Sequence, residues 1–208
     1  MTRRLVLLRH GQTAWNAIGR GQGHADVELD DTGHEQASAV APYVAAYAPT
    51  VLWSSDLARA RQTAAYVSKE TGLDARLDER FREFDLGART GLTMAEYAEQ
   101  FPAEYADFRA GHFTAVPGGE TTADVVSRFA DGLDDVVAGL DAGECGVVVA
   151  HGAALKVALM AALNWPGEQA SGLQGLDNCG WAVLEELDEG GRFRLAAYNL
   201  IARPTPPG

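Results

Sequence analysis

Basic residues are scarce in this sequence. Its 208 residues include 17 Lys and Arg but 29 Asp and Glu, which gives a formal net charge of −12. Nucleic acids are bound by basic surfaces that displace counterions from the phosphates, so the composition excludes nucleic acid as a main partner. The same charge disfavours binding to anionic lipid.

Long hydrophobic runs are absent and cysteines are few. No apolar run approaches the roughly 20 residues that a membrane helix needs, and the run 5–8 is too short for a signal peptide. We therefore expect a cytoplasmic protein without a membrane segment. Cys145 and Cys179 are the only cysteines, and neither lies in a metal-binding spacing, which predicts two reduced structural thiols.

Short apolar runs alternate with helical patterns along the chain. Runs typical of strands buried on both faces cover 4–8, 51–53 and 146–150. Helical spacing covers 35–47, 56–70, 121–140 and 153–163. Asp56 is the predicted N-cap of the second helix and Gly72 its predicted stop, while Pro49 ends the first. This order predicts an α/β fold with a mostly parallel central sheet and helices on both faces.

Three further segments complete the organisation. The Gly- and Pro-rich stretch 84–119, with short helical segments at 93–100 and 104–109, is interpreted as an insertion over one end of the sheet. Segments 181–187 and 193–198 alternate as two strands of a hairpin. The proline-containing tail 203–208 is expected to be loose. Without an internal repeat or linker, residues 1–208 are predicted to form one domain.

Two histidines follow buried strands in the same way. His10 and His151 each come directly after an apolar run and precede glycine, so both belong at the carboxyl edge of the sheet, where open α/β folds place their sites. Arg9 adds a fork of donors suited to a tetrahedral oxyanion. Arg59 and Arg61 are about 200° apart on a helix, so only one can point into a shared pocket, and local spacing does not say which.

These residues resemble a known family. Arg9–Thr13 (RHGQT) resembles the RHGxT signature of the histidine phosphatase superfamily, in its phosphoglycerate-mutase-like branch. Other segments resemble family elements in the same order, over residues 4 to about 199: Trp15–Asn16, 29–37 (LDDTGHEQA), 54–64 (SSDLARARQTA), Glu83 with Gly87, 117–121 (PGGET), 147–152 (VVVAHG) and Asn178–Cys179.

The resemblance implies a phosphohistidine mechanism. His10 would be the nucleophile, with its second ring nitrogen donating to the Gly11 carbonyl. Arg9, Arg59 and His151 would surround the phosphoryl oxygens. The family pattern selects Arg59 rather than Arg61, because Arg59 precedes Ala in the LxRA segment.

The resemblance also implies further site residues. It places Asn16, Gly11 and Gly152 at the phosphate and makes Glu83 the general acid and then the base. It implies no metal and no cofactor, since arginines and histidines take the part of a metal ion. A different interpretation of Glu83 is a surface carboxylate beside Arg80 and Arg82.

One segment departs from the family pattern. Residues 87–91 (GARTG) replace a GxWEG element, so that Thr90 takes the place of a glutamate. This leaves the shape of the leaving-group pocket open. Asp85 could substitute in part for Glu83 or raise its pKa as a like charge. Trp15, five residues after His10, is a candidate for lining the pocket.

Three functions remain in competition. The favoured one is a phosphatase of a small phosphorylated metabolite, with a resemblance to the phosphatases of glucosyl-3-phosphoglycerate, of other sugars or nucleotides, and of α-ribazole. The second is a cofactor-dependent phosphoglycerate mutase, disfavoured because Arg89, Arg109 and Arg128 are the only Lys or Arg between Glu83 and His151. The third is a regulatory or binding member without activity, disfavoured because the motif residues are all present. The family resemblance leaves a homodimer open.

Overall fold

A six-stranded sheet forms the centre of the molecule. The computed structural model describes residues 2–109, 116–187 and 191–202. The strands are ordered β3-β2-β4-β1-β5-β6; their bounds are β1 Arg4–Arg9, β2 Val51–Ser54, β3 Ala75–Leu77, β4 Cys145–Ala150, β5 Trp181–Glu186 and β6 Phe193–Leu200. Strands β1 to β4 pair in parallel, and β5 and β6 pair antiparallel. The mostly parallel sheet is confirmed.

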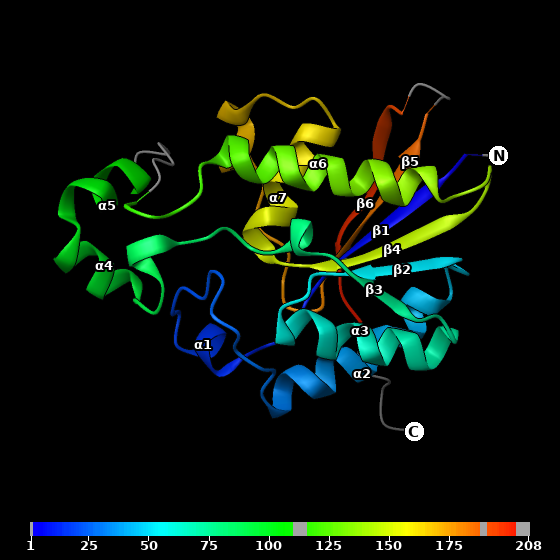
Figure 1. The fold of residues 1–208 in the computed structure, drawn as a ribbon, viewed down its shortest axis with the longest axis horizontal. Helices are drawn as coiled ribbons and strands as arrows, with labels where there is room; N and C mark the ends of the chain where they lie inside the picture. Colours follow the sequence, from blue (N-terminus) through cyan, green and yellow to red (C-terminus); the bar gives the residue numbers. More distant parts are fainter. Residues whose placement is uncertain (1, 110–115, 188–190, 203–208) are drawn as a thin grey trace.

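Helices cover both faces of this sheet (Figure 1). On one face lie α2 (Asp31–Ala45) and α3 (Ala58–Thr71), and on the other lie α6 (Thr122–Ala138) and α7 (Gly152–Ala162). Alternation along β1 explains the two layers, since Leu5 and Leu7 join the core cluster of α6 and α7 whereas Val6 and Leu8 join that of α2 and α3. A strand buried on both faces reads as a continuous apolar run.

The insertion extends beyond the sheet. It contains the short helices η2 (Gly87–Arg89), α4 (Met94–Gln100) and α5 (Pro102–Arg109). Helices α4 and α5 lie off the end of the sheet in Figure 1. A capping box at Thr93 begins α4, and Tyr97 packs its ring against Phe101, Tyr105 and Phe108. The two helical segments expected here are confirmed. The remaining short helices are α1 (Ala14–Ala17), η1 (Glu79–Phe81) and η3 (Gly167–Gly172).

Helix ends show where local sequence patterns fail. The prediction that Asp56 caps α3 is wrong: the N-cap is Leu57, and the Ala58 N–H donates to Asp26 from a distant loop at 2.6 Å. Asp56 instead accepts from Arg82 Nε at 2.8 Å. The predicted stop at Gly72 is confirmed by its φ of +74°, a conformation that glycine adopts without cost.

Other expectations have mixed outcomes. Helix α2 begins earlier than predicted, because Asp30 accepts from the Gly33 N–H, and it contains Pro42. The strand β3 was not predicted.

Both cysteines are buried and free, and burial raises the pKa of Cys145 to about 11 and that of Cys179 to about 12. The tail 203–208 and most of the predicted hairpin turn lie outside the described residues, and the single-domain organisation remains a prediction.

In the described parts of the chain, no helix is both long enough and apolar enough to cross a bilayer.

Candidate active site

The two histidines lie side by side at the carboxyl edge of the sheet. Strands β1 and β4 are in register, with Arg9 opposite Ala150, so the residues that follow them, His10 and His151, are neighbours. Their ring centroids are 5.1 Å apart. Both side chains are buried, with 3% and 0% of their surface exposed. The sheet register thus creates the pair that the strand endings predicted.

His10 is held as a neutral imidazole with one lone pair free. Its Nδ1 lies 2.7 Å from the Gly11 carbonyl oxygen. A carbonyl only accepts, so Nδ1 carries the proton and Nε2 carries the lone pair. Burial lowers the pKa of His10 well below its ordinary value, and the positive charges of Arg59 and Arg9 lower it further. This geometry agrees with the expected tautomer and with a nucleophile ready at neutral pH.

Gly11 itself can only be glycine. A Cβ at this position would lie 2.5 Å from the carbonyl oxygen of Gly33, a contact that neither backbone can relieve. The Gly11 N–H donates to Thr63 Oγ1 at 3.0 Å, which secures the turn against α3. The close approach of two glycine backbones therefore fixes the carbonyl on which His10 rests.

His151 is fixed by two partners. Arg59 Nε donates to its Nδ1 at 3.1 Å, so Nδ1 is the unprotonated nitrogen, and its Nε2–H donates to Ser55 Oγ at 2.8 Å. Burial lowers the pKa of His151 well below its usual value, with Arg59, His10 and Arg9 adding to the effect. Ser55 was not predicted as a functional residue, although its SSDL segment was part of the resemblance.

Two arginines bring positive charge next to His10. Arg59 is fully buried, and its terminal nitrogens donate to the Gly23 and Ala25 carbonyls at 2.8 Å each. Burial lowers its pKa to about 10, so it remains charged at neutral pH. Arg9 donates to the Leu176 carbonyl at 2.6 Å, while its Nε is buried without a partner in the described structure.

Neither arginine makes an ion pair within the described residues, and a buried unpaired cation is costly. This arrangement favours an anionic ligand. The exposed Arg61, by contrast, lies 3.9 Å from Asp26, in agreement with the choice of Arg59.

Asn16 and Gly152 complete the neighbourhood of His10 and Arg9. The side-chain oxygen of Asn16 accepts from the Thr13 N–H at 3.1 Å and from Asn178 Nδ2 at 3.3 Å. Asn178 also donates to the His10 carbonyl at 3.1 Å, a positioning contact that sequence reasoning did not assign. A Cβ at Gly152 would lie 3.1 Å from Arg9 Nε, so glycine leaves room for the guanidinium.

Glu83 is not a surface carboxylate paired with its arginine neighbours. Its oxygens accept from the N–H groups of Ala153 at 3.0 Å and Ala154 at 2.8 Å, at the N-terminus of α7. Arg80 pairs with Asp78 and Asp135, and Arg82 with Asp56, so the alternative interpretation of Glu83 is wrong. The helix terminus directly after His151 thus holds the Glu83 carboxylate beside the histidine pair.

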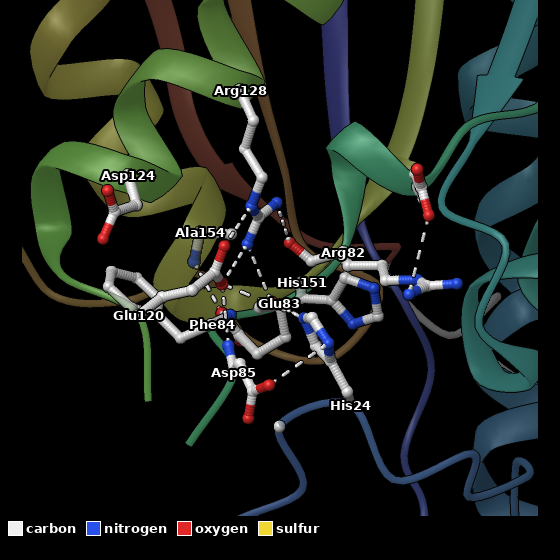
Figure 2. Close-up of polar contacts among 12 residues, drawn as sticks. His24, Arg82, Glu83, Phe84, Asp85, Glu120, Asp124, Arg128, His151 and Ala154 are labelled. Atoms are coloured by element: carbon white, nitrogen blue, oxygen red, sulfur yellow. Dashed lines mark hydrogen bonds and ion pairs between the residues drawn. The ribbon is translucent and has the colours of Figure 1, made fainter. Parts of the chain in front are cut away.

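A polar network holds the segment that carries Glu83 (Figure 2). Arg128 of α6 donates to the carbonyls of Arg80, Arg82 and Glu83 at 2.8 to 2.9 Å and to both carboxylate oxygens of Glu120 at 2.8 Å. Glu120, from the PGGET segment, accepts the Asp85 N–H at 2.8 Å.

His24 completes this network from the opposite loop. Its Nε2 lies 2.9 Å from the Glu83 carbonyl and its Nδ1 lies 3.8 Å from Asp85. The Asp85 carboxylate also accepts the Gly87 N–H at 2.9 Å. Asp85 is therefore occupied by structural contacts, and a catalytic part for it remains a prediction.

These side chains open into a cavity of about 400 Å³. Of the residues that the sequence predicted, Arg9, His10, Asn16, Arg59 and Glu83 line it, whereas His151, Gly11 and Gly152 are not among the lining residues. The insertion supplies one wall through Arg89, Tyr97 and Phe108, and α7 supplies Lys156.

The set of lining residues corrects the expectation for Trp15 and also leaves out Thr90. Trp15 is not among the lining residues and lies instead beside Gly91. Thr90, which replaces the usual glutamate, is not among them either. Within the described residues, no three His, Cys, Asp or Glu side chains are grouped as a metal site would need.

Comparisons with known proteins agree with this geometry. The family model described as the histidine phosphatase superfamily (branch 1) matches residues 5–200. A glucosyl-3-phosphoglycerate phosphatase of Mycobacterium tuberculosis is 40% identical over 97% of this chain and 96% of that protein. A metal-independent phosphoserine phosphatase of Arabidopsis thaliana is 35% identical over 73% of this chain and 65% of that protein.

A solved structure extends the comparison to the fold. The mycobacterial glucosyl-3-phosphoglycerate phosphatase in complex with VO3 superposes with a TM-score of 0.87 at 36% identity, covering 95% of this chain and 98% of that one.

Proposed function

The chain belongs to the histidine phosphatase superfamily, and on that premise we propose that it hydrolyses a small phosphomonoester through a phosphohistidine on His10, without a metal ion. The observation that carries this proposal is a neutral, buried His10 with a free Nε2, placed beside two arginines that have no carboxylate partner. A nucleophile and an anion site are thus combined in one cavity.

The first step forms a covalent intermediate. The Nε2 lone pair of His10 attacks phosphorus in line, the N–P bond forms and the P–O bond to the leaving group breaks. Arg9 and Arg59 hold the phosphoryl oxygens, where fixed donors stabilise the charge of a loose transition state. His151 exchanges Ser55 for a phosphoryl oxygen at its Nε2–H, and Asn16 donates its amide. Gly11 fixes the His10 tautomer, and Gly152 leaves space for Arg9.

Glu83 handles the proton in both steps. The leaving alkoxide takes a proton from the Glu83 carboxyl as the P–O bond breaks. The resulting carboxylate then accepts a proton from water as that water attacks the phosphohistidine, which releases phosphate and restores His10. Contacts to two α7 N–H groups hold the carboxyl at the site throughout.

Within this class, we assign glucosyl-3-phosphoglycerate as the first substrate to test, because relatives with that printed activity match nearly the whole chain. Hydrolysis is favoured over a mutase reaction because few of the basic residues between Glu83 and His151 are available to hold a second phosphate. Arg128 is committed to Glu120 and three carbonyls, and Arg109 is exposed and does not line the cavity, which leaves Arg89 alone of the three.

The proposal is tested by phosphate release with EDTA present. The panel contains p-nitrophenyl phosphate, 3-phosphoglycerate, 2,3-bisphosphoglycerate, phosphoserine and glucosyl-3-phosphoglycerate, with interconversion of 2- and 3-phosphoglycerate followed in parallel. We expect release that persists in EDTA and that falls by about 100-fold or more in His10→Ala. Rapid interconversion with little release would identify a mutase, and full activity in His10→Ala would refute the phosphohistidine.

Cellular location and assembly form part of the same proposal. We propose a cytoplasmic enzyme whose partner is a small phosphorylated metabolite. Light scattering of the purified protein decides between a monomer and the homodimer that the family resemblance leaves open.

A further inference from the structure

Arg89 is one of the two residues, with Thr90, by which the insertion departs from the family pattern, and it lines the cavity. It lies in η2, within the 87–91 segment (GARTG) that replaces a GxWEG element. The mechanism proposed above gives it no part, although it lines the same cavity as His10 and Glu83.

The contacts of Arg89 hold it in place without neutralising it. Its guanidinium carbon lies 5.1 Å from the ring centre of Tyr97 and 4.9 Å from that of Phe108, and a terminal nitrogen lies 3.8 Å from Met94 Sδ. No carboxylate forms an ion pair with it among the described residues. Burial lowers the pKa of Arg89, and interactions with Tyr97 and with Glu83 counter part of that effect. The cation is therefore partly withdrawn from water.

Lys156 is a second cation without an acidic partner in this cavity. It lies on α7 one turn after Ala153, whose N–H binds Glu83, and its side chain is half-buried. The described residues place no carboxylate within ion-pair distance of its ammonium group. The chain has only two lysines, and 29 acidic residues compete for 17 Lys and Arg, so an unpaired lysine inside a cavity is unexpected.

Two other charged pairs of the cavity are already formed within it or at its edge. Arg20 pairs with Glu96, and Glu120 pairs with Arg128. Arg9 and Arg59 are assigned to the phosphoryl group. Arg89 and Lys156 therefore remain for another part of the substrate, next to the acid that protonates the leaving group.

We propose that Arg89 and Lys156 form a subsite for a carboxylate on the leaving group of the substrate. This inference rests on the proposed function and narrows it to phosphomonoesters of hydroxy acids. An arginine fork and an ammonium group bind a carboxylate through charge-assisted hydrogen bonds. A second phosphate group would need more donors than these two, and among the described residues the cavity holds no further unpaired arginine to supply them.

The test compares two ligands that differ only in this group. D-3-phosphoglycerate carries a carboxylate where the glycerol phosphate of the same configuration carries a hydroxymethyl group. Each compound is measured as a competitive inhibitor of p-nitrophenyl phosphate hydrolysis, so that turnover of the reporter tests the proposed function separately. For the wild-type protein we expect the Ki of 3-phosphoglycerate to be lower than that of the glycerol phosphate by a factor of about ten or more. This factor corresponds to one charge-assisted contact.

Variants assign this preference to the two cations. Lys156→Met and Arg89→Met keep an unbranched apolar stem without the charge, and each should bring the ratio of the two Ki values toward one. Lys156→Glu should reverse the preference. Lys69→Met makes the same substitution at the other lysine, which is exposed on α3, and should leave both the ratio and the reporter activity unchanged.

The outcomes separate the two proposals. A wild-type ratio near one, or a ratio that both Met variants preserve, overturns the subsite while the reporter activity still supports a phosphatase. A wild-type protein that does not hydrolyse p-nitrophenyl phosphate through His10 overturns the proposed function and the subsite with it.

Discussion

At the scale of single residues, the site depends on hydrogen bonds that fix tautomers. His10 and His151 are both neutral imidazoles, and each has the position of its proton set by a neighbour: the Gly11 carbonyl for His10, and Arg59 Nε with Ser55 Oγ for His151. An imidazole with the wrong nitrogen protonated cannot serve as nucleophile or donor. The small groups that hold the rings are therefore as necessary as the rings.

Ser55→Ala tests this dependence. Ser55 Oγ fixes the ring orientation and the tautomer of His151 before a phosphoryl oxygen takes over the Nε2–H. Without this acceptor the ring is no longer held ready to donate, so we expect kcat/KM for p-nitrophenyl phosphate to fall by about ten-fold. Ser55→Thr retains the hydroxyl and should retain most of the activity. Equal losses in the two variants would show that packing, rather than the hydrogen bond, is what matters at this position.

The site residues also show how far sequence can lead. The strand–His–Gly pattern and the RHGxT and LxRA motifs located Arg9, His10 and Arg59, and the resemblance of Glu83 with Gly87 to an acidic family element located Glu83; these four residues line one cavity. Ser55 was missed because its role requires β2 and β4 to be neighbours, and the acceptors of Arg59 are the carbonyls of Gly23 and Ala25, which carry no side-chain signal.

At the scale of elements, α6 is joined to the loop that carries Glu83, the proposed general acid. Arg128 donates to three successive parts of that loop and to Glu120, with five hydrogen bonds of 2.8 to 2.9 Å. The carbonyls of Arg80, Arg82 and Glu83 are thereby fixed relative to the helix. The Glu83 carboxyl is positioned from two sides, by α6 through Arg128 and by the N-terminus of α7.

Arg128→Lys tests the positioning of the acid. An ammonium group cannot make the five contacts, so Glu83 should protonate the leaving group less efficiently. We expect kcat/KM for an alkyl phosphate such as glycerol phosphate to fall by about ten-fold or more, with a smaller loss for p-nitrophenyl phosphate, whose leaving group needs little protonation. Glu83→Gln should show the same selectivity more strongly. A uniform loss for both substrates would indicate general damage to the fold instead.

Elements were predicted well where the pattern is local and poorly where the partner is distant. The buried strands β1, β2 and β4 are continuous apolar runs and were found within one residue at each end. Strand β3 has only three residues, two of them exposed, and exists because it pairs with β2. The cap of α3 comes from Asp26 in another loop, so the nearby Asp56 misled the prediction.

At the scale of the whole molecule, an acidic protein carries a site for an anion. The net charge of −12 repels phosphorylated metabolites at long range, but salt limits that effect to about 8 Å at physiological ionic strength. Attraction therefore acts only near the cavity, where Arg9 and Arg59 lie partly or wholly out of water and their fields are weakly screened. Under the proposed function, the molecule binds its substrate by local charge.

Stability against pH is the property of the whole molecule that this site controls. The pKa values of His10 and His151 are both well below 6.5 in the folded protein, chiefly because of burial. Below pH 6.5 the unfolded chain binds protons that the folded one does not, so the free energy of unfolding falls as pH falls. The loss reaches at most about 1.4 kcal/mol per pH unit for each histidine, and above pH 6.5 this contribution is constant.

Urea unfolding between pH 7.5 and 5 checks this pH dependence. The wild-type protein should lose stability steadily below pH 6.5, and the double variant His10→Gln/His151→Gln, which has neither buried imidazole, should lose distinctly less over the same interval. Acidic residues that titrate at lower pH are common to both proteins and cancel in the difference. If the two curves run parallel from pH 6.5 to 5, the buried histidines take up protons in the folded state. The neutral form that the nucleophile requires would then be lost at mildly acidic pH.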